Sequence, residues 1–355
     1  MEEFEQRPEF FILQGNYGAL VEQHQRGKPV VEELMILLSD DNAAVRGGAT
    51  ATLGAIGEVD ADAVKQAAPR LMALLEDEDE DVRRNAAWAI WLVAESDTDV
   101  VKGAVPSLIR LLDDEVAVTR GAVAAALWVI ARSHPGPVAD GAAKFKVLLN
   151  DDFSLVRGAA AANLGILAER NVEIVEGSVP RLLALADDQD ANVRRNVVAA
   201  LAAIGRARPQ LIGQFVPRLV GLLNDEDAGV RGHAISAVGV VAEADLEAAR
   251  TAMPELAGLL DDEDYTVRGH AIAVVGGIGG RDPSAVADAA PRLITLLEDS
   301  DAYVRGAAAA AIGEIGRGDA ELVKEAVPKL VKLLEDEDVY VRGAATTALQ
   351  IIREA

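Results

Sequence analysis

The sequence predicts an all-α fold, a right-handed α-α superhelix of nine two-helix repeats, each 37 residues long. Two observations carry this prediction. An arginine recurs nine times at intervals of 37 residues, and an aspartate precedes every one of these arginines by six residues. Two short helices fit in one such repeat, and stacked repeats bury their apolar faces against one another as a solenoid. The arginines are Arg46, Arg83, Arg120, Arg157, Arg194, Arg231, Arg268, Arg305 and Arg342.

The second helix of each repeat contains the recurring arginine. Four residues before the arginine, seven of the nine repeats carry Asn or Asp, residue types whose side chains cap helix N-termini. Apolar residues follow at one position before the arginine and at 3, 7 and 10 positions after it, which is one face of an α-helix. Val82, Ala86, Ile90 and Val93 are an example.

The first helix of each repeat carries a Leu-Leu pair, such as Leu74-Leu75, before an acidic turn. Seven repeats have a proline fourteen residues before the arginine, as at Pro69. The residues before that proline still have a helical pattern. We therefore expect a kinked first helix that passes through the proline. No stretch alternates with period two over the length of a strand, so we expect no sheet.

The repeats account for residues 29–355, which we expect to form one continuous solenoid. The first 28 residues do not match the repeat. Their apolar side chains suit a helical capping segment that covers the open end of repeat 1. These side chains are Phe4, Phe10, Phe11, Ile12, Leu13 and Tyr17.

The repeat resembles a known family. The pattern Pro-x-Leu-x-x-Leu-Leu, an acidic turn, then Val-Arg-x-x-Ala-x-x-Ala-Ile-Gly-x-Ile-Gly, runs from Pro291 to Gly316. It is similar to HEAT repeats, which are armadillo-like, and in particular to the short HEAT-like repeats of bilin (phycobilisome) lyases. The resemblance implies the architecture and says little about activity. It also implies that the Asp and Arg rows form a ladder between repeats. A catalytic residue is needed once and not nine times.

The chain is strongly acidic, with 58 Asp and Glu against 34 Lys and Arg and a net charge of −24. Only 8 of the 34 cations are lysine. This composition is typical of proteins from a salt-filled, halophilic cytoplasm, although an ordinary acidic protein is the alternative. Such a surface repels nucleic acid and anionic membranes. The chain has no cysteine, no signal-peptide pattern and no long uncharged apolar stretch, so we expect a cytoplasmic protein.

The face of the second helix at 1, 5, 8 and 12 residues after the arginine is expected to line the concave surface. It is mostly Gly or Ala, as at Gly306, Ala310 and Gly313. Glycine inside a helix costs about 0.5–1 kcal/mol relative to alanine, so it requires a reason. Either these helices pack tightly against the neighbouring layer, which we favour, or the groove is kept smooth for a partner backbone.

The three tryptophans interrupt this row of small residues. Trp91 and Trp128 occupy the same position in adjacent repeats, where five of the other seven repeats carry Gly, and Trp88 lies one turn from Trp91. We expect all three on one concave patch, flanked by Arg84, Glu95 and Arg132. Aromatic residues beside arginine are typical of binding hot spots. The alternative is that the indole rings fill a gap between repeats.

The favoured function is a non-enzymatic scaffold or adaptor that binds another protein in its concave groove at this patch. The alternative is an enzyme of the HEAT-like lyase or DNA glycosylase type. Trp91, Glu95 and Arg132 loosely resemble the tryptophan, carboxylate and arginine of HEAT-like glycosylases, but the groove has few cations for nucleic acid. The sequence predicts no catalytic residues, no cofactor and no metal. The partner's identity and the oligomeric state stay open.

Other motifs have ordinary explanations. His233 and His270 share one repeat position, and they would form at most a partial metal site. The Gly276-Gly280 segment resembles a phosphate-binding loop but follows no strand. The acidic turns lack the central Gly and the twelfth-position Glu of a calcium-binding EF-hand.

Overall fold

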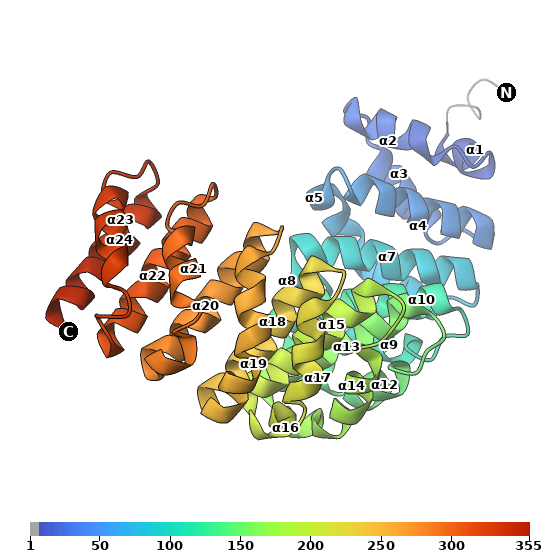
Figure 1. Ribbon diagram of the computed structural model, residues 1–355. Coiled ribbons are helices and arrows are strands. Elements are labelled where there is room, and N and C mark those ends of the chain that lie inside the picture. The colour runs from blue at the N-terminus through green and yellow to red at the C-terminus, as the bar shows by residue number, and fades with distance from the viewer. Residues whose placement is uncertain (1–6) are drawn as a thin grey trace. The chain divides into compact units, whose positions relative to one another are not determined.

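The computed structural model describes residues 7–355, and every regular element in that range is a helix. The prediction of an all-α fold without a sheet is confirmed for this part of the chain. Short and long helices follow one another along the chain (Figure 1), and turns or 3-10 segments separate them. The chain divides into two compact units, Met1–Ser178 and Val179–Ala355, and each is described by itself.

The N-terminal unit contains the two helices before the repeats, then repeats 1 to 4 and the first turns of repeat 5. Its elements are α1 (Pro8–Leu13), α2 (Tyr17–Gln25), α3 (Val30–Leu37), α4 (Ala43–Gly57), α5 (Ala61–Val64), η1 (Lys65–Ala67), α6 (Ala68–Ala73), η2 (Leu74–Glu76), α7 (Glu80–Ser96), α8 (Thr98–Val101), η3 (Lys102–Ala104), α9 (Val105–Leu111), α10 (Ala117–Ser133), α11 (Pro135–Ala139), α12 (Ala142–Leu148), α13 (Ser154–Arg170), η4 (Val172–Ile174) and η5 (Glu176–Ser178).

The C-terminal unit contains the rest of repeat 5 and repeats 6 to 9. Its elements are α14 (Val179–Leu185), α15 (Ala191–Ala207), α16 (Gln210–Gly213), α17 (Val216–Gly221), η6 (Leu222–Asn224), α18 (Ala228–Ala244), α19 (Leu246–Gly258), η7 (Leu259–Asp261), α20 (Tyr265–Arg281), η8 (Pro283–Val286), α21 (Ala290–Leu296), α22 (Ala302–Gly318), η9 (Lys324–Ala326), α23 (Val327–Leu333) and α24 (Val339–Glu354).

The long second helices of successive repeats pack side by side in each unit. In the N-terminal unit α7 contacts both α4 and α10, and in the C-terminal unit α22 contacts both α20 and α24. The predicted apolar face points into the core: Val82, Ala86 and Ile90 are 0% exposed and Val93 is 1% exposed. The shorter helices contact the long ones, as α9 contacts α10 and α23 contacts α24, so each repeat buries its apolar surface against its neighbours.

The predicted helix caps are present in all seven repeats that carry Asn or Asp at the capping position. The Asp79 carboxylate accepts hydrogen bonds from the backbone N–H groups of Asp81 and Val82 at 3.0 and 3.1 Å. These bonds satisfy donors that have no partner within the helix. The seven capping residues are Asn42, Asp79, Asp190, Asp227, Asp264, Asp301 and Asp338.

The expectation of a kinked helix that passes through the proline is wrong in most repeats. Only α19 continues as an α-helix through its proline, Pro254. In the other proline-containing repeats a new α-helix begins one residue before the proline, as α6 does at Ala68. Proline has no N–H group and its ring collides with the carbonyl four residues earlier. The preceding turn therefore departs from α geometry, for example as the 3-10 turn η1, and proline sits in the first helical turn, where it fits.

The segment before the repeats packs on repeat 1. Helices α1 and α2 contact α4, and they bury Ile12 (4% exposed) and Leu20 (0% exposed). The side chain of Ile12 lies against Gly48 of α4. Phe4 is outside the described residues. The limit of this segment at residue 28, and one continuous solenoid over residues 29–355, stay predictions. Along residues 7–355, none of the helices combines the length and the hydrophobicity needed to cross a bilayer.

Candidate functional site

The Arg and Asp rows form the ladder that the resemblance implied. Arg46 donates from Nε and Nη2 to the two carboxylate oxygens of Asp77 at 2.8 and 2.9 Å, and from Nη1 to the backbone carbonyls of Asp40 and Asp41. One guanidinium thus joins its own acidic turn to that of the next repeat. The other pairs within the units are Arg83–Asp114, Arg120–Asp151, Arg194–Asp225, Arg231–Asp262, Arg268–Asp299 and Arg305–Asp336.

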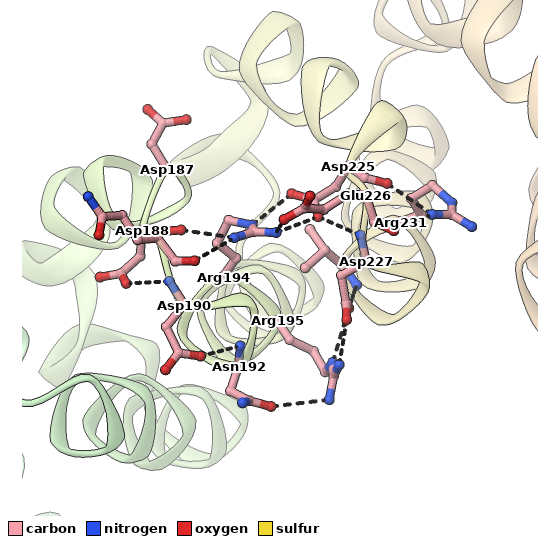
Figure 2. A network of polar contacts seen from close by, with 12 residues as sticks. Asp187, Asp188, Asp190, Asn192, Arg194, Arg195, Asp225, Glu226, Asp227 and Arg231 are labelled. Atoms are coloured by element: carbon pink, nitrogen blue, oxygen red, sulfur yellow. Dashed lines mark hydrogen bonds and ion pairs between the residues drawn. The ribbon is translucent and has the colours of Figure 1, made fainter.

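Figure 2 shows the ladder around Arg194, where Arg194 and Asp225 each have several partners. Arg194 binds the Asp225 carboxylate at 2.8 Å and the Asp188 carbonyl at 3.0 Å. Asp225 also accepts from the backbone N–H of Asp227 at 2.9 Å. The hydrogen bond to Asp225 raises the pKa of Arg194, and the hydrogen bond from Arg195 lowers the pKa of Asp227. The Arg194 guanidinium and the Asp225 carboxylate thus use their hydrogen bonds to join adjacent repeats, so these two groups have a structural role.

An apolar groove lies on the N-terminal unit, over the second helices of repeats 2, 3 and 4. It encloses about 400 Å³. Its walls come from α7, α10 and α13, and they are mainly indole, aliphatic and glycine surface. The lining residues are Arg84, Asn85, Trp88, Trp91, Val118, Gly121, Ala122, Ala125 and Leu155.

Glycines on two helices shape this groove. The Leu155 side chain lies over Gly121, 2.9 Å from the point where a Cβ would be, and the Trp88 ring covers Gly54 of α4 with a corresponding distance of 2.4 Å. A larger residue at either glycine would displace the side chain above it. Trp88 therefore fills a gap between repeats 1 and 2 and also forms part of the groove wall. A role of this side chain in binding stays a prediction.

The structure separates the six predicted site residues. Arg84, Trp88 and Trp91 line the groove. Trp128 is half-buried outside the lining, with the guanidinium of Arg132 5.5 Å from its ring centroid in a cation–π contact. Glu95 is exposed and also lies outside the lining.

The sequence interpretation missed Val118 and Leu155, two aliphatic groove residues that are 48% and 52% exposed. Both lie two residues before the recurring arginine, and no other repeat has an aliphatic residue larger than alanine there. That difference is a signal that comparing the repeats could have found. Asn85, also missed, donates from Nδ2 to the Gly47 carbonyl at 3.1 Å and so fixes one end of the groove.

The glycines of the second helices support the packing interpretation. A Cβ on Gly313 would lie 2.9 Å from the Cα of Ala348, and one on Gly306 would lie 2.2 Å from the ring of Tyr340. The next repeat therefore approaches closely because these positions lack a side chain.

The other candidate chemistries receive no support. Within residues 7–355, no group of three His, Cys, Asp or Glu side chains is arranged to hold a metal ion. Burial, with a smaller effect from His270, lowers the pKa of His233. The Gly276-Gly280 segment is the interior of helix α20, where the backbone N–H groups are used within the helix.

Comparison with known proteins identifies the family. The HEAT-repeat profile matches residues 31–128, 142–215, 179–257 and 290–355, most of the chain. The chain belongs to the HEAT-repeat family. No curated protein sequence matches it significantly.

Crystal structures of three engineered proteins from the Northeast Structural Genomics Consortium have a similar fold. The first is 24% identical with a TM-score of 0.76, and the match covers 99% of this chain and 97% of that one. The other two are 26% and 27% identical, with TM-scores of 0.52 and 0.56. Each match covers 60% of this chain, and 96% and 98% of the engineered chain respectively. The first similarity shows the fold alone.

Proposed function

We propose that this protein is a non-enzymatic scaffold or adaptor that binds a partner protein in the groove of repeats 2 to 4. The observation that carries the proposal is the clustering of Trp88 and Trp91 with the exposed side chains of Val118 and Leu155. Tryptophans beside an arginine, around exposed aliphatic surface, are typical of binding hot spots. Exposed apolar surface gathered in one groove marks an interaction site.

The groove walls favour binding over catalysis. A lyase or glycosylase needs an acid, a base or a nucleophile that faces its substrate. The only ionisable side chain in the groove wall is Arg84, which forms an ion pair with Asp81. Glu95 and Arg132, which a glycosylase mechanism would require beside Trp91, lie outside the wall.

The acidic composition supports a halophilic origin, and the absence of cysteine fits a reducing cytoplasm. Both are part of the proposal. At about 1 M salt the Debye length is about 3 Å, so the repulsion expected from a net charge of −24 is largely screened.

The test is affinity purification at high salt with two matched double variants. Val118→Ser/Leu155→Ser removes exposed groove surface and leaves Trp88, which also packs between repeats. Val59→Ser/Val147→Ser removes similarly exposed valines (54% and 69% exposed) outside the groove of the same unit. We expect the groove variant to lose partners that the wild type and the control variant retain. Equal recovery of the same partners by all three proteins would reject the groove as the binding site.

A further inference from the structure

The groove has a direction and a length, and both restrict what can occupy it. Its walls on α7 run from Arg84 to Trp91, a separation of seven residues or about 10 Å along the helix axis. On α10 they run from Val118 to Ala125, again a separation of seven residues. The groove is therefore a furrow along α7 and α10, with Leu155 of α13 at its side, and it is about as long as the distance from residue i to residue i+7 of another helix.

The groove walls offer little to an extended peptide. They are helical, so their backbone N–H and C=O groups already pair within the helices. The amide nitrogen of Asn85 donates to Gly47. An extended peptide would cover apolar wall surface with its own backbone groups unpaired, which is costly. A helix satisfies its backbone internally and presents side chains at i, i+4 and i+7 to the furrow.

The rim at one end of the furrow is acidic. Glu115 and Asp152 lie in the turns just before α10 and α13, and Glu80 is the first residue of α7; all three carboxylates are exposed. Among the described residues, no Lys, Arg or His forms an ion pair with any of these three. Arg84, the one cation of the wall, is paired with Asp81. This end therefore attracts positive charge, in addition to the steering expected from the net charge of −24.

We propose that the groove binds an amphipathic helix of the partner, antiparallel to α7 and α10, with Lys or Arg at the helix's C-terminal end. The inference rests on the proposed binding function. Its apolar residues at i, i+4 and i+7 contact Trp91, Trp88 and the Val118–Leu155 surface. Its C-terminal cations face Glu80, Glu115 and Asp152. The antiparallel direction also places the negative end of the partner's dipole beside the positive N-termini of α7 and α10.

The test is fluorescence anisotropy with the full-length chain and labelled synthetic peptides. The first peptide is an alanine-rich helix with leucine at i, i+4 and i+7 and lysines in its last turn. The comparison peptides replace the lysines with glutamates, replace the leucines with serines, or contain a central proline that breaks the helix. We expect the first peptide to bind about tenfold more tightly than the glutamate peptide at 0.15 M KCl, with the difference shrinking at about 2 M KCl.

Two matched variants test the rim. Glu115→Gln/Asp152→Asn should weaken binding of the lysine peptide about fivefold. Glu263→Gln/Glu337→Gln, at the same repeat position in repeats 7 and 9, should leave the affinity unchanged. Equal binding of the lysine and glutamate peptides, equal binding of the proline peptide, or equal effects of the two variants would overturn the inference.

The proposed function can survive that failure. If no peptide binds, but Val118→Ser/Leu155→Ser still loses a protein partner that Val59→Ser/Val147→Ser retains, this inference is wrong and the groove is still a binding site. If the groove variant retains every partner as well, the proposed function fails too.

Discussion

The guanidinium of Arg231 donates from Nε and Nη2 to the two carboxylate oxygens of Asp262, 31 residues later, at 2.7 Å each. Arg231 is 8% exposed and its Nη1 also binds the carbonyls of Asp225 and Glu226. The planar guanidinium group has its N–H donors in the directions of these acceptors, whereas a lysine ammonium cannot donate to all of them. Each of these paired arginines of the recurring row therefore links its own repeat to the next one.

Removing the Arg231–Asp262 ion pair should destabilise the C-terminal unit. Arg231→Met leaves Asp262 partly buried without its cation, and we expect a loss of about 3 kcal/mol in the free energy of unfolding. Arg231→Lys should recover less than half of that loss. Urea unfolding followed by circular dichroism measures both. A change below about 0.5 kcal/mol for Arg231→Met would show that the ladder does not stabilise the stack.

Two adjacent glycines of α20 should respond in opposite directions to alanine. A Cβ on Gly276 would lie 2.8 Å from the backbone Cα of Ala311, whereas a Cβ on Gly277 meets no atom within 4 Å. We expect Gly276→Ala to lose about 1–3 kcal/mol through overpacking. Gly277→Ala should gain about 0.5–1 kcal/mol through helix propensity. Melting temperatures of the two variants test this, and equal shifts would contradict the packing account.

Trp88 should be costly to remove, because its ring fills the space above Gly54. We expect Trp88→Ala to destabilise the N-terminal unit by about 3 kcal/mol, and Trp91→Ala, for which no such glycine contact is present, to cost clearly less. Urea unfolding of the two variants gives the comparison. If Trp91→Ala costs as much as Trp88→Ala, the assignment of Trp88 to the gap between repeats is wrong.

Features that recur in every repeat could be predicted from the sequence, whereas features that depend on contacts between particular repeats could not. The fold and the caps follow from period and residue type, since each repeat performs the same local task. The Arg–Asp ladder was expected from the resemblance to HEAT-like repeats. The groove does not follow from period and residue type, because it depends on neighbouring repeats together. The Leu155 side chain lies over Gly121, which belongs to the preceding repeat. The position of this side chain therefore depends on the residue type at position 121 as well as on its own repeat. The prediction of a helix that passes through the proline was wrong because the residues before the proline have a helical pattern. The collision of the proline ring with the preceding turn nevertheless ends the helix in most repeats.

Acid should weaken the ion pairs between repeats. The hydrogen bond from Arg305 lowers the pKa of Asp336, and the bond from Arg195 lowers that of Asp227. A carboxyl whose pKa is lower folded than unfolded stabilises the fold fully above its unfolded value, about 3.9, and loses that contribution as the pH falls through the folded value. The urea concentration at the unfolding midpoint should therefore decrease as the pH drops below about 4. This decrease should be less steep in Asp336→Asn. An unchanged midpoint between pH 5 and pH 3 would contradict this.

Salt should stabilise the protein. With a net charge of −24, self-repulsion opposes the compact state, and screening removes it. We expect the melting temperature to rise by more than about 10 °C between 0.1 M and 2 M KCl, or the chain to unfold at the lower concentration. A melting temperature that stays constant over this range would contradict the proposed halophilic origin.

Site-specific photo-crosslinking shows whether a partner protein contacts the groove. A photoreactive phenylalanine analogue is placed at Val118 in the groove, or at Thr266, the same repeat position in repeat 7. Crosslinking is performed in extract at high salt. We expect a discrete protein adduct at position 118, lost when Leu155→Ser is added, and no such adduct at position 266. The same adduct at both positions, or no adduct at position 118, would contradict a partner-binding site in this groove.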